Sequence, residues 1–177
     1  FYGPKIDFHL EDSLGRTWQC GTIQLDFQMP LNFGLEYTDE KGEKQRPIMI
    51  HRVCFGSIER FIGIITEHFA GKFPLWLAPT QVKVLPVSEK TAEYSEKVYE
   101  AIRKAGLRCE LDSRNEKIGY KIREAQSVDR VPYMLILGAK EAEENTVSVR
   151  NRDTAETVTM PLDDFLNMAL KQNKNRE

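Results

Sequence analysis

The sequence lacks the features that mark membrane proteins, disulfide-rich proteins and proteins that coat nucleic acid. No stretch approaches the ~18 uncharged apolar residues of a membrane-spanning helix, and no segment has the pattern of a secretory signal peptide. The three cysteines are widely spaced and form no C-x-x-C pair, so a disulfide framework is not indicated. The formal net charge is −2, which excludes nucleic-acid binding over the whole surface but not through one basic patch. We therefore expect a cytoplasmic protein with reduced thiols and no membrane partner.

The composition is that of an ordinary folded protein. With 177 residues, 41% of them hydrophobic and 29% charged, the chain suffices for one large domain or for one domain and part of another. It contains no internal repeat and no low-complexity segment. It opens at Phe1 within a structured pattern and without an initiator methionine, so we expect a piece of a longer protein.

The first part of the chain has the period of β-strands. Residues 5–11 alternate between apolar and polar side chains, and a second alternating strand starts near Thr17. An apolar strand at 47–54 is followed by apolar residues at helical spacing, with Ser57 placed to cap that helix. A polar row along a strand suits the floor of a site open to water, although a solvated sheet face is the commoner origin of such a row.

The pattern changes after the stretch from Gly71 to Pro79, which has two prolines and no period. We take this stretch as a boundary and predict one domain over 1–78 and a second over 79–177. The second part alternates strands with helices, which predicts an α/β domain with a mixed sheet and about three helices. The expected strands lie at 81–87, 107–111, 131–137, 146–150 and 156–160, and the expected helices begin near Tyr94, Ser113 and Pro161.

Two stretches of the first part carry a more specific pattern. The first is Phe1-Tyr2-Gly3-Pro4-Lys5 followed by W-Q-C-G-T-I-Q-L-D-F at 18–27, and the second is H-R-V-C-F-G-S-I-E-R-F at 51–61. They resemble the end of the catalytic domain of the threonyl-tRNA synthetase family, and Gly-Ser-x-Glu-Arg is similar to the third signature motif of class II synthetases. The segments R-N-E-K-I-G-Y-K-I-R-E at 114–124 and V-P-Y-M at 131–134 resemble that family's anticodon-binding domain. The resemblance covers essentially the whole chain and implies the end of a class II antiparallel catalytic sheet followed by an α/β anticodon-binding domain.

The resemblance implies a threonine–tRNA ligase, which activates threonine with ATP and Mg²⁺ and transfers it to threonine tRNA. The family is dimeric, so the implied partners are threonine, ATP, threonine tRNA and a second copy. The alternative is a non-catalytic tRNA-binding module or a synthetase paralogue, and retention of Gln19, Thr22, His51 and Arg60 together favours the enzyme. We expect this piece alone to be inactive, because it lacks the rest of the active site. Its catalytic portion has too few strands to bury its own sheet, so we expect that portion to be the less stable one.

Several residues of the first part are implied to bind ATP and the substrate. Activation places negative charge on phosphate, which requires fixed cations and oriented donors. Arg60, in the first turn of its helix, can contact a phosphate or stack on adenine. Gln19 has the opposite strand parity from Thr22, so both face one site only if the strand bulges near Cys20-Gly21. The resemblance makes Arg60 and Lys5 catalytic, assigns Gln19, Thr22 and Arg60 to ATP, and assigns Tyr2, Gln24 and Ser57 to the substrate.

His51 is the implied metal ligand. A lone histidine on an apolar strand is more often a satisfied core residue. The family, however, holds a Zn²⁺ ion that binds the amine and hydroxyl of threonine, and the histidine at this position is one of its ligands. A zinc site needs three protein ligands and this chain supplies one, so we expect the piece to bind zinc weakly or not at all.

The second domain is expected to read the anticodon. Arg114, Lys117 and Lys121 lie at i, i+3 and i+7, which predicts a basic stripe on a helix, with a solvated charged face as the common alternative. Unstacked bases are read on their exposed edges by hydrogen-bonding side chains. Ala139 departs from the family's pattern, in which Asp precedes Lys-Glu, and this departure bears on the loop that carries Glu141. The resemblance places the base-contacting positions at Asn115, Glu141 and Arg150.

Overall fold

The chain divides into two compact units, Phe1–His68 (unit 1) and Phe69–Glu177 (unit 2). The computed structural model describes residues 2–177, so Phe1, the first residue of the first motif, lies outside the described part. Within residues 2–177, no helix combines the length and the apolar character needed to cross a membrane.

Unit 1 is built on a three-stranded antiparallel sheet. Its strands are β1 (Lys5–Glu11), β2 (Thr17–Asp26) and β5 (Met49–Val53), with β2 in the centre. The alternation seen in the sequence produces this sheet because it puts the apolar side chains on one face. The charged segment before β5 forms the short antiparallel pair β3 (Tyr37–Thr38) and β4 (Lys44–Gln45).

Helices α1 (Gln28–Asn32) and α2 (Ile58–His68) complete unit 1. α1 follows β2 directly, because the Asp26 carboxylate accepts the backbone N–H groups of Gln28 and Met29 at 2.8 and 2.9 Å. α2 begins after Ser57, whose Oγ accepts the N–H of Arg60 at 3.4 Å, so the predicted N-cap is confirmed. The sequence pattern does not predict α1, which is too short to show helical periodicity.

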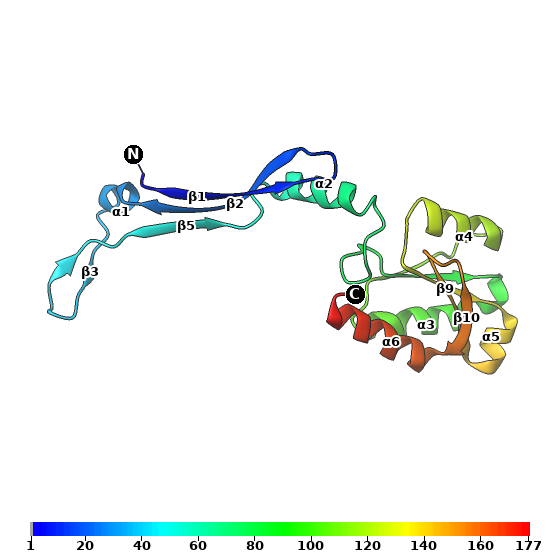
Figure 1. Cartoon of the computed structure of the whole chain (residues 1–177). Helices are drawn as coiled ribbons and strands as arrows, with labels where there is room; N and C mark the ends of the chain where they lie inside the picture. Colours follow the sequence, from blue (N-terminus) through cyan, green and yellow to red (C-terminus); the bar gives the residue numbers. More distant parts are fainter. Residues whose placement is uncertain (1) are drawn as a thin grey trace. The chain divides into compact units, whose positions relative to one another are not determined.

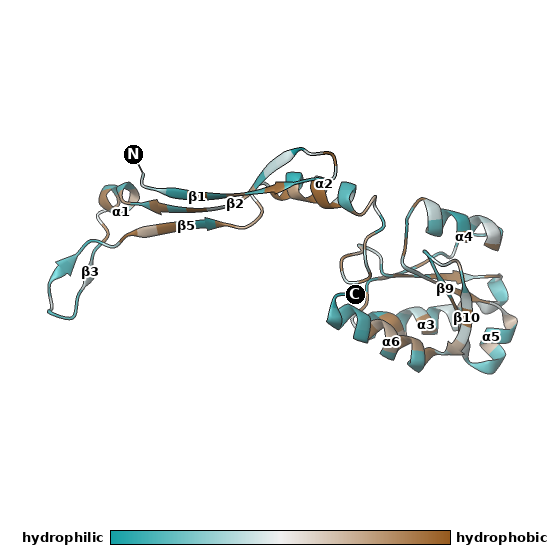
Figure 2. Cartoon of the chain, in the orientation of Figure 1, coloured by the Kyte–Doolittle hydropathy of each residue, from teal (hydrophilic) through white to brown (hydrophobic). Residues whose placement is uncertain are grey.

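Unit 1 buries little apolar surface. On the apolar face of its sheet, Ile6 is 60% exposed, Phe8 53% and Ile50 62%. No residue of α2 is buried, although Figure 2 shows this helix as largely hydrophobic. Three strands are near the lower limit for independent stability even with a covered face. The exposure supports the expectation that this part of the chain is the less stable one.

Unit 2 is a mixed α/β domain, as the sequence predicts. Its five-stranded sheet has the order β10-β9-β8-β6-β7, in which β6 is parallel to β7 and β8, while β9 and β10 continue in antiparallel pairing. Its elements are β6 (Val82–Pro86), the 3₁₀ turn η1 (Glu89–Thr91), α3 (Ala92–Lys104), β7 (Cys109–Leu111), α4 (Ile118–Ser127), β8 (Tyr133–Leu137), α5 (Ala139–Glu144), β9 (Thr146–Asn151), β10 (Thr157–Pro161) and α6 (Leu162–Asn175).

Helices cover both faces of this sheet (Figure 1). On one face, Val84 and Leu135 belong to the main core with Phe165 of α6 and the apolar side of α3. On the other face, Met134 packs with Ala125 of α4 in a smaller cluster. β8 is therefore buried on both sides, which explains its continuous apolar run.

Residues 69–80 form an ordered segment of unit 2. Arg108 donates to the carbonyl oxygens of Trp76 and Ala78, both at 2.9 Å. The buried side chain of Arg152 donates to the carbonyl oxygen of Phe73 at 3.0 Å. These contacts hold residues 69–80 in unit 2, and unit 1 ends at His68. The sequence places the domain limit at 78/79 instead, and that limit stays a prediction.

Candidate functional site

Polar side chains share one face of the sheet in unit 1. Strand pairing sets Lys5 opposite Gln24, Gln24 opposite His51, and Asp7 opposite Thr22. Residues directly opposite on antiparallel strands project to the same face, so these side chains form two adjoining rows. Lys5 Nζ lies 2.8 Å from Asp7 Oδ2. This contact, together with a hydrogen bond from Thr22, holds the pKa of Asp7 below its ordinary value.

A β-bulge brings Gln19 to the same face. Gln19 and Gly21 pair with successive residues of β1, which leaves Cys20 between them as the extra residue. Gln19 Nε2 consequently donates to Asp7 Oδ1 at 2.8 Å and to Thr22 Oγ1 at 3.2 Å. The expectation that the strand bulges near Cys20 is confirmed.

Arg60 reaches this site from the first turn of α2. Its Nη2 donates to the backbone carbonyl oxygen of Gln19 at 2.5 Å. Gly56 keeps this path open, because it has a φ of +65° and an added Cβ would lie 2.7 Å from Arg60 Nη2. The three residues that the resemblance assigns to ATP, Gln19, Thr22 and Arg60, thus lie in one hydrogen-bonded group.

A buried carboxylate orients His51. Asp26 is 1% exposed, and its Oδ2 lies 2.7 Å from His51 Nε2. Burial acts to raise the pKa of Asp26, but hydrogen bonds from the Met29 amide and from His51 outweigh burial, and the pKa is lowered. The carboxylate is therefore the acceptor, and His51 Nε2 donates to it. Histidine–carboxylate pairs of this kind orient metal-ligating histidines.

Tyr2, Gln24 and His51 line one open hollow of about 210 Å³, together with Asp26 and Met29. The hollow therefore unites two of the residues assigned to the substrate with the one assigned to zinc. Ser57, the third residue assigned to the substrate, is not part of its lining. A zinc site needs three protein ligands, and residues 2–177 contain no cluster of three candidate ligands. His51 fits one position of a zinc site, and this chain does not complete the site.

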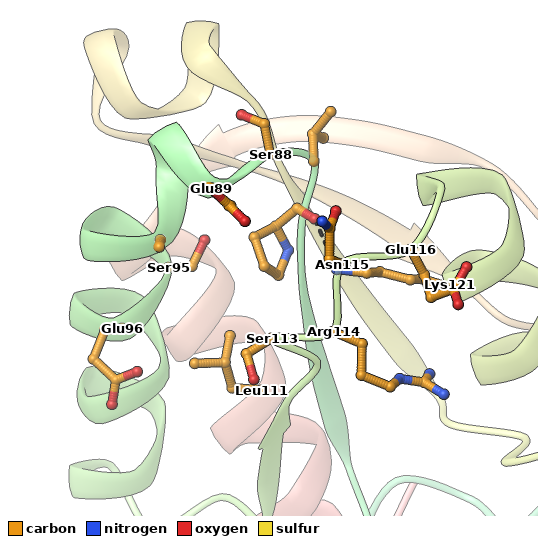
Figure 3. Close-up of a pocket in the computed structure, with 13 residues that line it drawn as sticks. Ser88, Glu89, Ser95, Glu96, Leu111, Ser113, Arg114, Asn115, Glu116 and Lys121 are labelled. Atoms are coloured by element: carbon orange, nitrogen blue, oxygen red, sulfur yellow. Dashed lines mark hydrogen bonds between the residues drawn. The ribbon is translucent and has the colours of Figure 1, made fainter.

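In unit 2, Asn115 lies at the carboxyl edge of the parallel strands. Beyond the ends of β6 and β7 is a cavity of about 140 Å³, lined by the start of α3 and by residues 113–116. Figure 3 shows Asn115 on this loop, among the residues that line the cavity. Open α/β sheets commonly bind ligands outside the carboxyl ends of their strands.

Glu141 follows the neighbouring strand β8. One of its carboxylate oxygens accepts the N–H of Gly138 at 2.8 Å, and the other accepts the hydroxyl of Ser148 at 2.7 Å. Burial acts to raise the pKa of Glu141, but these two hydrogen bonds lower it and keep the carboxylate charged. Ala139 is the exposed first residue of α5, so the departure at that position leaves Glu141 anchored.

Arg150 lies on β9, where its Nη1 donates to the carbonyl oxygen of Ala155 at 2.7 Å. Ser148 and Arg150 are two residues apart on one strand and therefore project to the same face. Through Ser148, Glu141 and Arg150 border one surface, while Asn115 lines the cavity. The contributions of these three residues to base recognition stay predictions.

The predicted basic stripe is wrong. α4 begins at Ile118, so Arg114 precedes the helix, where its guanidinium pairs with Asp112 at 2.6 and 2.9 Å. Lys121 is 3% exposed, and its ammonium donates to the carbonyl oxygens of Asp112 at 2.9 Å and Pro86 at 3.3 Å. Helical spacing suggests that the three basic side chains form a solvated row. The row does not form, because the Lys121 ammonium donates to carbonyl groups at strand ends instead.

The sequence did not predict the burial of Asp26 and Lys121, two charged residues that shape these sites. Asp26 has the strand parity of Thr22 and Gln24, and this signal could have placed it beside His51. Lys121 had no comparable signal, because its spacing from Arg114 fits a surface helix equally well.

The comparisons with known families agree with this division of the chain. Residues 81–172 match the family described as the anticodon binding domain, and residues 1–69 match the tRNA synthetase class II core domain (G, H, P, S and T). The first match covers more than half of the chain, so the chain belongs to the anticodon binding domain family.

The relatives narrow the class further. The chain is 65% identical over 172 residues to the threonine–tRNA ligase of Caldanaerobacter subterraneus subsp. tengcongensis, a match covering 97% of this chain and 27% of that ligase. It is 62% identical over 177 residues to the ligase of Acetivibrio thermocellus, with 100% and 28% covered. The crystal structure of the RNA binding domain of threonyl-tRNA synthetase from Cryptosporidium parvum Iowa II has a TM-score of 0.86 and 43% identity, and the match covers 97% of this chain and 43% of that one. The resemblance to threonyl-tRNA synthetases is confirmed, and the chain spans about a quarter of the ligases' length.

Proposed function

We propose that this chain is part of a threonine–tRNA ligase, carrying its anticodon-binding domain and one wall of its catalytic site. The observation that carries the proposal is the polar face of unit 1. There Gln19, Thr22 and Arg60 form one hydrogen-bonded group, and His51 lines the adjoining hollow. The bulge at Cys20 turns Gln19 toward the face that carries Thr22. A face that only contacts water would not need such a bulge.

Arg60 supplies the fixed cation for ATP in this proposal. A guanidinium that is bonded to the carbonyl group of Gln19 can hold phosphate oxygens or stack on adenine. Lys5 adds a second cation at the same face, where it pairs with Asp7 while no phosphate is bound. ATP would bring Mg²⁺, which neutralises charge on the phosphates.

The hollow lined by Tyr2, Gln24 and His51 is the proposed threonine site, with Ser57 near the start of α2 as a further substrate contact. Zn²⁺ bound there would hold the amine and the hydroxyl of threonine. Valine lacks the hydroxyl and would be rejected. His51 is oriented for this role by Asp26, and the remaining ligands would come from parts of the ligase that this chain does not contain.

Threonine tRNA is the proposed partner of unit 2, with Asn115, Glu141 and Arg150 contacting the anticodon bases. Glu141 and Arg150 border one surface, and both are held by hydrogen bonds to neighbouring strands or turns. The complete ligase would work in the cytoplasm, as a homodimer.

A chimeric ligase tests the catalytic part of the proposal. The Acetivibrio thermocellus ligase, with this chain in place of its matching segment, should catalyse threonine-dependent exchange of pyrophosphate into ATP, a step that needs no tRNA. Arg60→Ala should slow the exchange by about 100-fold or more, as loss of a charge-stabilising donor does. Arg123→Ala, at an exposed arginine of α4, is the matched control and should leave the rate unchanged. A folded chimera with no exchange activity, or equal rates for both variants, would refute the assignment.

A further inference from the structure

Three hydrogen-bonded side chains, Glu141, Ser148 and Thr159, form a row across α5, β9 and β10 (the hydroxyl row). Ser148 donates its hydroxyl hydrogen to Glu141 Oε1 at 2.7 Å, and its Oγ lies 2.9 Å from Thr159 Oγ1. Strand pairing sets Thr159 directly opposite Ser148, so both hydroxyl groups project to the same face of the sheet. Ser148 is buried and Thr159 is exposed. The hydroxyl row therefore leads from an anchored carboxylate to the surface.

The charge of Glu141 sets the direction of each hydrogen bond in the hydroxyl row. Burial acts to raise the pKa of Glu141, but hydrogen bonds from Ser148 and the Gly138 amide outweigh burial and lower it. An ionised carboxylate only accepts, so the single hydroxyl hydrogen of Ser148 belongs to Glu141. Thr159 must then donate its own hydrogen to Ser148 Oγ. Only lone pairs of Thr159 Oγ1 are left for an incoming group, so the exposed end of the row is an acceptor.

The same face carries a donor beside this acceptor. Arg150 pairs with Thr157, which is two residues before Thr159 on β10, so its guanidinium projects to the face of Thr159. Figure 1 shows β9 and β10 side by side. A guanidinium only donates hydrogen bonds. The surface thus presents a donor and an acceptor of fixed direction, which suits the edge of an unstacked nucleobase.

We infer that Thr159 accepts a hydrogen bond from an N–H group of one anticodon base, and that Ser148 is the positioning residue that keeps Thr159 an acceptor. Neither residue is among the positions that the resemblance assigns to base contact. The inference rests on the proposed function, since it requires unit 2 to bind an anticodon loop whose bases are splayed out. A phosphate group is disfavoured, because it has no hydrogen to donate and the Glu141 carboxylate repels it. A ribose 2′-hydroxyl can donate to the same oxygen, so the test distinguishes it from a base.

The test measures binding of the full chain to threonine tRNA and to three versions of it, each with one anticodon nucleotide made abasic. Thr159→Val keeps the shape of the side chain and should weaken binding of the intact tRNA by about three- to tenfold, the range of one net hydrogen bond. On one abasic tRNA, the one missing the donor base, Thr159→Val should cause no further loss. On three tRNAs with a 2′-deoxynucleotide at the same positions, the loss should persist. Thr159→Ser keeps the hydroxyl and should bind as the wild type does.

Ser148→Ala tests the direction of the hydrogen bonds. Without Ser148 Oγ, the Thr159 hydroxyl turns freely and can donate as well as accept. The variant should keep most of its affinity for the unchanged tRNA. Its preference among the four bases, at the position that Thr159→Val identifies, should fall by about threefold or more. A purely structural role of Ser148 would instead weaken binding of all tRNAs by the same factor.

Thr80→Val is the matched control. Thr80 Oγ1 also donates to a glutamate carboxylate, Glu110 Oε1 at 2.7 Å. Glu110 belongs to β7, and β7 and β10 are the opposite edges of the sheet. The control therefore removes a hydrogen bond between the same two residue types without touching the hydroxyl row. Thr80→Val should bind every RNA as the wild type does.

The outcomes separate this inference from the proposed function. If the wild-type chain binds the three abasic tRNAs as tightly as the intact tRNA, anticodon reading and the Thr159 contact both fail. If the wild type distinguishes them but Thr159→Val keeps full affinity, or loses the same factor on every RNA, only the Thr159 contact fails. A loss that disappears on a 2′-deoxy tRNA assigns the donor to a ribose and overturns the base contact. An unchanged base preference in Ser148→Ala overturns the positioning role.

Discussion

Single buried charged side chains set the local geometry of both units. Asp26 stays ionised inside unit 1 because two backbone N–H groups and His51 donate to it. Lys121 is buried in unit 2, where two carbonyl oxygens accept from its ammonium. Each charge is hydrogen-bonded to groups of opposite partial charge, which is the condition under which burial is tolerated. Removing either group would leave its partners unpaired.

Lys121→Met keeps the length of the side chain and removes the ammonium. We expect the free energy of unfolding of unit 2 to fall by about 1–3 kcal/mol, because two buried carbonyl groups lose their donor. Hydrogen exchange of the β6 and β8 amides measures this change. The control is Lys117→Met, at the exposed residue before α4, which should change stability by less than about 0.5 kcal/mol. Equal protection in the two variants would show that the buried ammonium contributes nothing.

The residue scale is also where sequence prediction was most limited. The bulge at Cys20 could be predicted. Without it Gln19 and Thr22 would project to opposite faces of the sheet, although the resemblance assigns both to ATP. The burial of Lys121 could not be foreseen, because it depends on carbonyl oxygens contributed by segments far away in sequence. The polar atoms that a side chain contacts are set by the tertiary structure.

At the scale of elements, long periodic segments were predictable and short capped ones were not. β1 was predicted with its observed bounds, and β6, β8 and β9 within two residues, because their alternation or apolar runs follow directly from burial. α1 and α5 are only five and six residues long. They are initiated by single carboxylates, Asp26 and Glu141, that accept nearby N–H groups.

The turn between β5 and α2 gives a paired test. At Gly56 the backbone is left-handed and an added Cβ would contact Arg60, whereas an added Cβ at Gly63 meets no described atom within 4 Å. Gly56→Ala should therefore destabilise α2 by about 1–2 kcal/mol, while Gly63→Ala should stabilise it by about 0.5–1 kcal/mol. Hydrogen exchange of the α2 amides reports both. A Gly56→Ala variant that is as stable as the wild type would contradict the left-handed backbone at Gly56.

At the scale of the whole chain, the two units differ in how much apolar surface they bury. Unit 2 has a main core of fully buried side chains that includes Val84, Leu135 and Phe165. Unit 1 leaves the apolar face of its sheet exposed, at Ile6, Phe8 and Ile50 among others. Unit 2 should therefore be the more stable part of the chain.

Limited digestion with thermolysin, which cleaves beside apolar residues, should cut unit 1 first. We expect a resistant fragment that retains residues 70–177, because the segment 69–80 is tied to unit 2 by Arg108 and Arg152. Mass spectrometry of the products over time locates the cuts. Cleavage within unit 2 as fast as within unit 1, or early cleavage in the segment 69–80, would contradict this description.

We propose that unit 2 reads the anticodon of threonine tRNA, and the binding of two tRNAs that differ in one anticodon base tests this proposal. The full chain, Asn115→Ala and Asn167→Ala are compared for binding to threonine tRNA and to the same tRNA with one changed anticodon base, at one fixed salt concentration. Asn167 is exposed on α6 and serves as the matched control. We predict that the wild type and Asn167→Ala prefer the unchanged tRNA by about tenfold or more, and that Asn115→Ala loses this preference. Equal, weak and salt-sensitive binding of both tRNAs by the wild type would contradict the claim.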